Sequence, residues 1–164
     1  MDNITIRQVI EQDVDACYTV ESRCFHPSEA ASKKKIEKRI RIFPQGFFVA
    51  EFGGMVVGHV NSAATHKDDI TDEALKDMVG HEHDGKNLVI FSLAVLPEFQ
   101  KQGIARELML RFIEEARKLR KQKVLLICKA ELIRYYQQHG FMYGGKSDST
   151  HGGFEWHEMV LSLV

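Results

Sequence analysis

Alternating apolar and polar residues mark several short segments, and this two-residue period is typical of a strand with one buried face. The stretch ITIRQV (4–9) shows it near the N-terminus. Two further runs, GFFVAEF (46–52) and MVVGHVNSAA (55–64), flank the pair Gly53-Gly54. Because glycine adopts positive φ without strain, such a pair between two strands predicts a two-residue hairpin turn.

Other segments repeat apolar residues every three to four positions, which is the period of an amphipathic helix. We expect a first helix from Asp13, whose carboxylate would cap the first turn, to about Phe25. Further helices are expected over 28–43, in a short segment that opens at Thr71, over 104–119 with Leu108, Phe112, Ala116 and Leu119 on one stripe, and in ELIRYYQQHG (131–140), which Gly140 ends.

Four more apolar runs predict strands: NLVIFSLAV (87–95), KVLLICK (123–129), FMYGGK (141–146) and FEWHEMVLSL (154–163). Strands and helices are interspersed along the chain without a repeat or a linker. The pattern therefore predicts a mixed α/β (α+β) protein that forms a single domain over residues 1–164.

Composition and charge narrow the class of protein. The 164 residues are 44% apolar and 27% charged, with a net charge of −1, which argues against a general nucleic-acid-binding surface. Apolar runs are too short to span a membrane, and MDNITIRQV lacks the features of a signal peptide. Cys17, Cys24 and Cys128 show no C-x-x-C spacing. We therefore expect a cytoplasmic protein without a nucleic-acid partner, a membrane or a bound metal.

One segment, SLAVLPEFQKQGIARELMLRF (92–112), carries candidate chemistry where a strand turns at Pro97 and feeds a helix. The first amides of a helix have no internal partners and carry the positive end of its dipole. Gly103 has no side chain to keep an anion from these amides, and Ala105 keeps the next turn narrow. The segment favours a phosphate or pyrophosphate site; the alternative is that Gly103 only eases a tight turn.

Two common phosphate-binding patterns, G-x-x-x-x-G-K-[ST] and G-x-G-x-x-G after a strand, do not occur here. Instead, Gln100, Gly103 and Ala105 fit the [QR]-x-x-G-x-[GA] signature of the GNAT N-acetyltransferase superfamily, which the chain resembles over most of its length. LIRYYQQHGF, with Tyr136 four residues before Gly140-Phe141, resembles the second mark of that family. LICKAELIRYYQQHGF and STHGGFEWHEM are most similar to the branch with serotonin (arylalkylamine) N-acetyltransferase and its bacterial relatives.

The resemblance implies the GNAT acyl-CoA N-acyltransferase fold, with a mixed central sheet of about six to seven strands flanked by helices. It implies acetyl-CoA as cosubstrate and Tyr136 as the group that protonates the departing thiolate. It also implies that backbone groups of Leu93, Ala94 and Val95 pair with the pantetheine arm. The pyrophosphate would be held by Lys101, Gln102, Gly103, Ile104, Ala105 and Arg106.

The activity implied by this resemblance is transfer of an acetyl group from acetyl-CoA to a primary amine by direct attack in a ternary complex. We expect a small-molecule amine as the acceptor. Acetylation of a protein or peptide amine, and a non-catalytic acyl-CoA-binding module, are the alternatives. Whether the chain forms a homodimer stays open.

The chain departs from the serotonin enzymes at the proton acceptor. Their two histidines fall on Val89 and Phe91, and Lys129 stands where many members have asparagine. Substitute proton acceptors are Glu21, which also fits a solvated helix position, and His81 and His83, which also fit a metal site or an ordinary loop. His151 fits the lining of the acceptor pocket, and Ser92 fits a role in orienting a water or a place in the core. Phe25, Phe47 and Trp156 fit the acceptor pocket or the core, and Cys128 fits a buried apolar residue better than a nucleophile.

Overall fold

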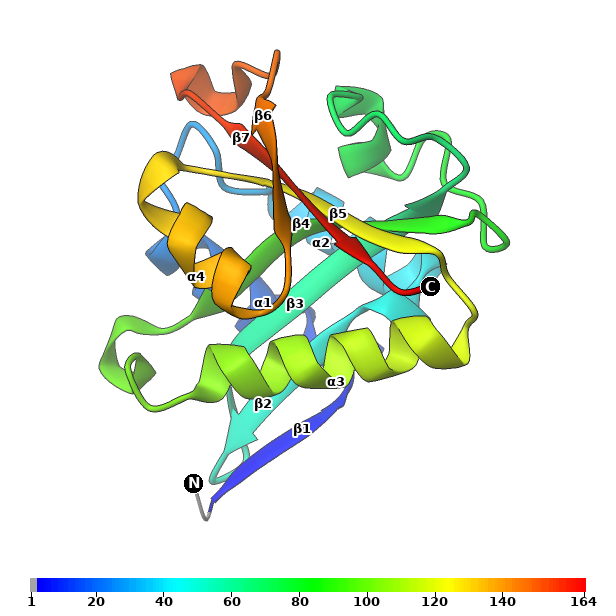
Figure 1. Ribbon diagram of the computed structural model, residues 1–164. Coiled ribbons are helices and arrows are strands. Elements are labelled where there is room, and N and C mark those ends of the chain that lie inside the picture. The colour runs from blue at the N-terminus through cyan, green and yellow to red at the C-terminus, as the bar shows by residue number, and fades with distance from the viewer. Residues whose placement is uncertain (1–2) are drawn as a thin grey trace.

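Seven strands form one mixed sheet in the computed structural model, which describes residues 3–164 (Figure 1). The order is β1-β2-β3-β4-β5-β7-β6, and every neighbouring pair is antiparallel except the parallel pair β4–β5. This confirms the predicted α/β class and strand number. The strands are β1 Ile4–Gln8, β2 Phe48–Phe52, β3 Met55–Thr65, β4 Asn87–Val95, β5 Lys123–Cys128, β6 Met142–Lys146 and β7 His157–Ser162.

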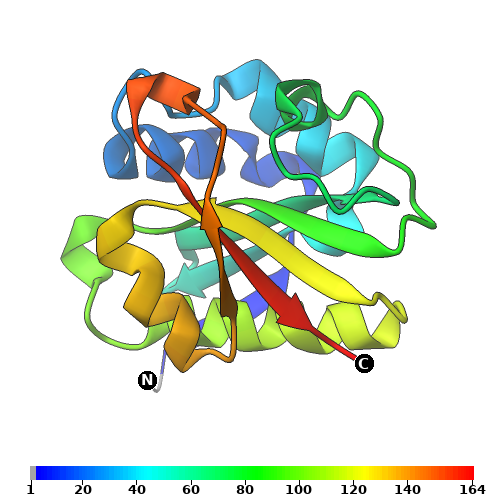
Figure 2. The same cartoon turned by 45° about the horizontal axis from the view of Figure 1, so that its top comes forward.

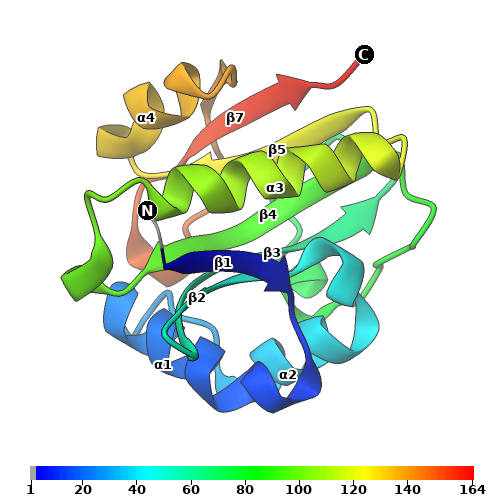
Figure 3. The ribbon, with the colours of Figure 1, turned by 90° about the horizontal axis from the view of Figure 1, so that it is seen from below.

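Helices cover both faces of the sheet (Figure 2). α1 (Val14–Cys24) and α2 (Lys33–Ile42) lie on one face, and α3 (Ile104–Lys118) and α4 (Ile133–Gln138) lie on the other (Figure 3). Short 3₁₀ turns join the elements, at Glu11–Asp13, Pro44–Gly46, Glu73–Asp77, Pro97–Phe99, Ala130–Leu132 and His151–Gly153.

The apolar stripe of α3 packs against the sheet as its spacing predicts. Leu108, Phe112 and Ala116 are buried, whereas Leu119 lies one residue beyond the helix and is 37% exposed. The expectation that Leu119 joins the stripe is therefore wrong, because the chain leaves the helical path at Lys118.

The hairpin prediction is confirmed. Gly53 and Gly54 have φ of 56° and 83°, and Phe52 pairs with Met55 across the two-residue turn. Positive φ at both positions is the conformation that makes two glycines favourable here.

One predicted helix cap and one predicted helix start differ from the structure. The Asp13 carboxylate does not cap α1; it accepts the Ile10 amide at 2.9 Å and pairs with Arg7 at 2.8 Å, so the preceding turn and β1 use its oxygens. The short helix after residue 71 is capped by Asp72, which accepts the Ala74 amide. This helix therefore begins at Glu73 and not at Thr71, whose hydroxyl donates to Asp69 at 2.6 Å.

The middle of the sheet opens between its two parallel strands. β4 pairs with β5 only from Asn87 to Val89, although it stays paired with β3 as far as Val95. β5 continues beside β7 as far as Cys128. The two strands therefore diverge beyond Val89, and the carboxyl-terminal half of β4 has no strand partner on that side among residues 3–164.

Packing of α3 predicts unequal costs for two identical substitutions. We expect Leu108→Ala, at a fully buried position, to lower the free energy of unfolding by about 2–5 kcal/mol, because it leaves a cavity in the core. Leu110→Ala, two residues away and 42% exposed, should cost less than about 1 kcal/mol. Urea unfolding measures both; equal losses would contradict the packing described here.

Candidate functional site

A groove of about 520 Å³ lies where β4 ends and α3 begins. Of the residues predicted to bind the cofactor, it is lined by Val95, Lys101, Gly103, Ile104, Ala105 and Arg106. Gln102 is exposed outside the groove, and Ala94 is buried within the sheet. Leu93 lines a second cavity instead. The structure thus gathers most of the predicted set along one turn.

The turn before α3 has an unusual backbone. Lys101 and Gly103 both have positive φ, 63° and 84°, and Gly103 is the residue from which α3 starts. A Cβ at Gly103 would meet no other atom within 4 Å, so glycine is favoured there by backbone conformation and the adjoining space is open. Gly103 therefore eases the turn, and its open side also leaves the entrance of α3 accessible; a phosphate site there stays a prediction.

Gln100 fastens this turn to the strand. Its side-chain amide donates to the Val95 carbonyl at 2.8 Å, and the Cys24 thiol lies 3.2 Å from the same oxygen. That carbonyl is therefore already paired within the protein, which leaves other backbone groups near the strand end to meet a ligand. The first residue of the signature acts as a brace between loop and strand.

The groove carries positive charge near the helix entrance. Arg106 and Lys101 line it, and burial lowers the pKa of His139, with the nearby Arg106 acting in the same direction. Two cations at the amino end of a helix suit a phosphate-bearing ligand, since both the cations and the helix end stabilise an anion.

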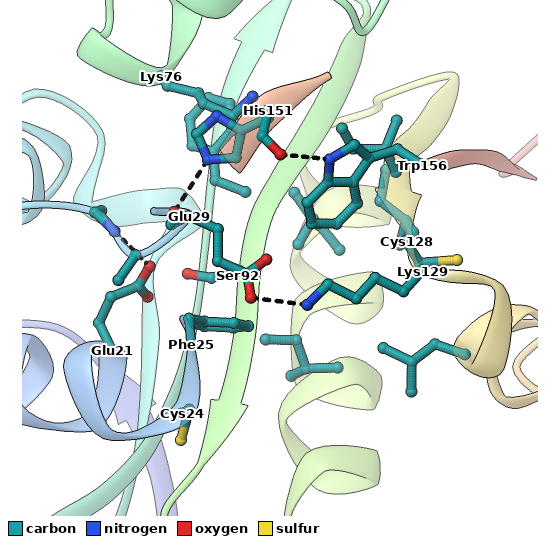
Figure 4. Close-up of a pocket in the computed structure, with 18 of the residues that line it drawn as sticks. Glu21, Cys24, Phe25, Glu29, Lys76, Ser92, Cys128, Lys129, His151 and Trp156 are labelled. Carbon is teal, nitrogen blue, oxygen red and sulfur yellow. Dashed lines mark hydrogen bonds and ion pairs between the residues drawn. The ribbon is translucent and has the colours of Figure 1, made fainter. Parts of the chain in front are cut away.

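A second cavity of about 290 Å³ lies on the α1 and α2 side of the opening between β4 and β5 (Figure 4). It brings together six residues predicted as candidates for proton transfer, for orienting a water or for the acceptor pocket: Glu21, Phe25, Ser92, Tyr136, His151 and Trp156. Leu93 lines this cavity and Val95 lines the groove, so the two spaces adjoin the same stretch of β4.

Three of the predicted candidates lie elsewhere. Phe47 is buried in the core. His81 and His83 stack near Phe43, and Nδ1 of His81 accepts the Ala64 amide at 3.0 Å. Burial, then His83, lowers the pKa of His81 to about 4, so its ring is neutral and serves the loop structure.

The neighbouring tyrosines of α4 face different spaces. Tyr135 lines the groove, and Tyr136, 7% exposed, lines the second cavity. Burial raises the pKa of Tyr136, and Cys128 and Tyr135 act in the same direction. Tyr136 is therefore a protonated phenol at neutral pH, as a proton donor must be.

Glu21 is the buried carboxylate of the cavity. It is 3% exposed, one oxygen accepts the Ala31 amide at 2.9 Å, and Oε1 has no hydrogen-bond partner among residues 3–164. Burial raises the pKa of Glu21, while the Ala31 amide and Arg39 act in the opposite direction. A solvated helix glutamate, the alternative reading of this residue, does not fit this environment.

His59, which sequence reasoning missed, stands behind Glu21. One Asn61 N–H donates to the Ser92 hydroxyl at 2.9 Å, and the other faces His59 Nδ1 at 3.2 Å. His59 therefore carries its proton on Nε2, which lies 3.4 Å from Glu21 Oε1. Burial, then Arg39, lowers the pKa of His59 to about 3, so the ring is neutral. A lone histidine in the apolar run MVVGHV is the signal that would have found it.

One wall of the cavity is an interlocked set of side chains (Figure 4). Lys129 Nζ lies 2.9 Å from the Glu29 carboxylate and 3.9 Å from the centre of the Phe154 ring. His151 faces the Glu29 carbonyl at 3.0 Å and Glu73 at 2.7 Å, so both of its ring nitrogens are engaged by other groups of this wall. His151 is thus a structural residue of this wall.

The remaining thiol on the cavity wall is inert. Burial, then Glu131, raises the pKa of Cys128 to about 11, which keeps the sulfur protonated and weakly nucleophilic. In the described part of the chain, no group of three or more His, Cys, Asp or Glu residues is placed to hold a metal ion. Within the same residues, no helix has the length and apolar character needed to cross a membrane.

The structure is a mixed α/β protein with a groove at a helix entrance beside an opened parallel strand pair, and sequence comparison gives the family. The chain belongs to the acetyltransferase (GNAT) family, whose sequence profile matches residues 11–141. Among solved structures, the loading GNATL domain of CurA from Lyngbya majuscula has the same fold, with a TM-score of 0.85 at 18% identity over 97% of each chain. The yncA protein of Salmonella typhimurium, solved with acetyl-CoA, has a TM-score of 0.68 at 20% identity over 99% of this chain and 95% of its own.

Two curated relatives come from Bacillus subtilis. One is YkwB, described as an uncharacterized N-acetyltransferase, 25% identical over 65% of this chain and 52% of its own length. The other is YhcX, described as a probable hydrolase, 26% identical over 75% of this chain and 25% of its own length. The chain therefore aligns with between a quarter and about half of these relatives.

The position of Gly103 at the entrance of α3 gives a testable prediction. We expect Gly103→Val to weaken acetyl-CoA binding at least tenfold, about 1.4 kcal/mol, because a β-branched residue disfavours the required φ and projects into the groove. Isothermal titration measures the affinity. Gly53→Val, a matched glycine with positive φ in the distant hairpin, should lower stability but leave binding unchanged. Wild-type affinity in the Gly103 variant would contradict the helix-entrance argument.

Proposed function

We propose that this protein transfers the acetyl group of acetyl-CoA to the amine of a small molecule that binds in the second cavity, which Glu21 and Tyr136 line. The observation that carries this proposal is the pair of spaces along one stretch of β4: a cationic groove at the entrance of α3, and a cavity with a buried carboxylate and a buried phenol. The branch that includes serotonin N-acetyltransferase stays a prediction.

The groove fits the cofactor on its own chemistry. The open side of Gly103 leaves room for a diphosphate near the first amides of α3, and Lys101 and Arg106 supply charge. Bound there, acetyl-CoA would supply an activated acetyl thioester. The free edge of β4 beyond Val89 offers unpaired backbone groups to its pantetheine arm.

Proton transfer sets the roles of the cavity residues. A primary amine with a pKa of about 10.4 must lose a proton before it attacks, at a cost near pH 7 of about 4–5 kcal/mol. The free oxygen of Glu21 accepts that proton, and the phenol of Tyr136 protonates the sulfur that leaves. The neutral His59, whose Nε2 lies 3.4 Å from the same oxygen, does not compete for the proton.

A compact acceptor fits the cavity better than an extended peptide. The loop after α1 and the segment before β7 are joined by Ser28, whose hydroxyl donates to the Gly152 carbonyl at 2.8 Å, and by the contact between His151 and the Glu29 carbonyl. These contacts close one side of the cavity. Release of thiol from acetyl-CoA with a panel of small amines tests the proposal; transfer only to peptides, or tight cofactor binding without any turnover, would contradict it.

Tyr136→Phe should lower kcat by about 100-fold or more while leaving acetyl-CoA affinity within about twofold, because it removes the proton donor and keeps the ring. Tyr18→Phe, at an exposed position of α1 that lines neither the groove nor the cavity, is the matched control, and we expect near-normal turnover. Thiol release and titration calorimetry measure the two quantities. Unchanged kcat in the Tyr136 variant would remove it from the role of acid.

Glu21→Gln should abolish the acidic limb of the pH–kcat profile. In the wild type, kcat should rise with pH as the carboxylate forms, above its ordinary range because burial raises the pKa. The amide keeps an oxygen for the Ala31 N–H but accepts no proton, so we expect about 100-fold lower kcat at pH 8. Glu131→Gln, an exposed carboxylate on the same cavity, should keep the wild-type profile. If both variants keep the limb, another group is the base.

A further inference from the structure

A buried arginine lines the acceptor cavity beside the catalytic groups. Arg39, on α2, is 2% exposed. Burial lowers its pKa to about 10, so the guanidinium is still charged at neutral pH. A buried cation normally has a carboxylate partner, because an uncompensated charge in the interior costs several kcal/mol. Within residues 3–164, no carboxylate oxygen lies within 4.0 Å of Arg39.

The hydrogen bonds of Arg39 leave part of its donor capacity unused. Nε and Nη2 donate to the Lys76 carbonyl at 3.3 and 3.2 Å, and Nη1 donates to Asn61 Oδ1 at 3.1 Å. A guanidinium has five N–H groups, so three are used and the other two have no acceptor in the described part of the chain. These acceptors are neutral, and the two carboxylates that act on the charge of Arg39, Glu21 and Asp77, do so without an ion pair to it within 4.0 Å among residues 3–164.

The plane of the guanidinium is fixed. Its central carbon lies 4.5 Å from the centre of the Phe91 ring, and the Asn61 and Lys76 bonds hold it from two other directions. A rigid fork with unused donors matches the geometry of a carboxylate, which it can bind through two oxygens.

We propose that Arg39 is the anchor for a carboxylate on the acceptor, and that the acceptor is therefore an amino acid or a similar amine that carries a carboxylate. This inference rests on the proposed function for the role of the amine. Glu21 and Arg39 line the same cavity as groups of opposite sign that lie more than 4.0 Å apart and do not pair. An amino acid presents matching groups, its amine to Glu21 and its carboxylate to Arg39. One guanidinium neutralises one carboxylate. Of the three lysines that line the same cavity, Lys76 and Lys129 are paired with Glu73 and Glu29, and Lys35 has no carboxylate within 4.0 Å among residues 3–164. A phosphorylated amine, which would need both Arg39 and Lys35, is therefore the alternative that the test must separate.

The test compares acceptors that differ only in the carboxylate. Phenylalanine is paired with 2-phenylethylamine, leucine with 3-methylbutylamine, and phosphoethanolamine is added as the phosphorylated amine. For the wild type we expect at least tenfold higher kcat/KM, and at least tenfold tighter binding in the presence of CoA, for the carboxylate member of each pair. Thiol release and titration calorimetry give the two readouts. Equal use of both members, or preference for phosphoethanolamine, would overturn the proposal.

Variants of α2 then assign the preference to one side chain. Arg39→Met should erase it, mainly through KM, and Arg39→Lys should keep only part of it because an ammonium lacks the planar fork. Arg41→Met removes the same charge from an exposed position on the same helix and should change nothing. A folded Arg39→Met protein that keeps the preference would overturn the proposal; if this variant does not fold, the wild-type comparison and Arg39→Lys still decide it.

The two proposals fail separately. Turnover of amines without regard to the carboxylate contradicts the Arg39 anchor and leaves the acetyltransferase intact. Carboxylate-selective binding that Arg39→Met removes, without thiol release from any acceptor, supports the anchor and contradicts the proposed transfer.

Discussion

The divergence of β4 from β5 is the constraint on which the site depends. Each strand keeps an antiparallel neighbour, β4 with β3 and β5 with β7, but they pair with each other over only three positions, from Asn87 to Val89. Beyond that point the two central strands separate and leave an opening, which backbone hydrogen bonds would close in a fully paired sheet. Backbone groups on the freed edge of β4 lack a strand partner, and buried backbone groups require one. The opening therefore supplies both the space for ligands and a reason for one to bind.

The sequence pattern predicted the helices and strands well, because each of them is specified by residues close together in the chain. The hairpin at Gly53-Gly54, the stripe on α3 and the turn at Gly103 each depend on residues within a few positions of one another. The predicted cap at Asp13 failed because Arg7 and the Ile10 amide compete for the same carboxylate oxygens. A propensity for capping does not reveal such competition.

The cluster of buried polar side chains around Arg39 could not be predicted from local patterns. Arg39 lies in KKKIEKRIRI, a basic segment typical of a solvated helix face, yet it is buried against Asn61, 22 residues away in sequence. Asn61 in turn connects Arg39, His59 and Ser92 through its amide. Only the packing of α2 onto the sheet brings these groups together. Burying these polar groups costs free energy that apolar side chains in the same places would not cost. Buried groups with perturbed pKa values are frequently functional.

The positions of the missing histidines fit this arrangement. Val89 and Phe91 make β4 apolar where the serotonin enzymes carry two histidines, and the Phe91 ring lies against the Arg39 guanidinium. A neutral aromatic ring attracts a cation, whereas a histidine at position 91 would become an imidazolium facing it whenever it accepted a proton. A proton acceptor on β4 and a charged guanidinium on α2 therefore oppose each other. A carboxylate on α1 avoids the conflict, because the same positive charge that would disfavour an imidazolium favours the ionised Glu21.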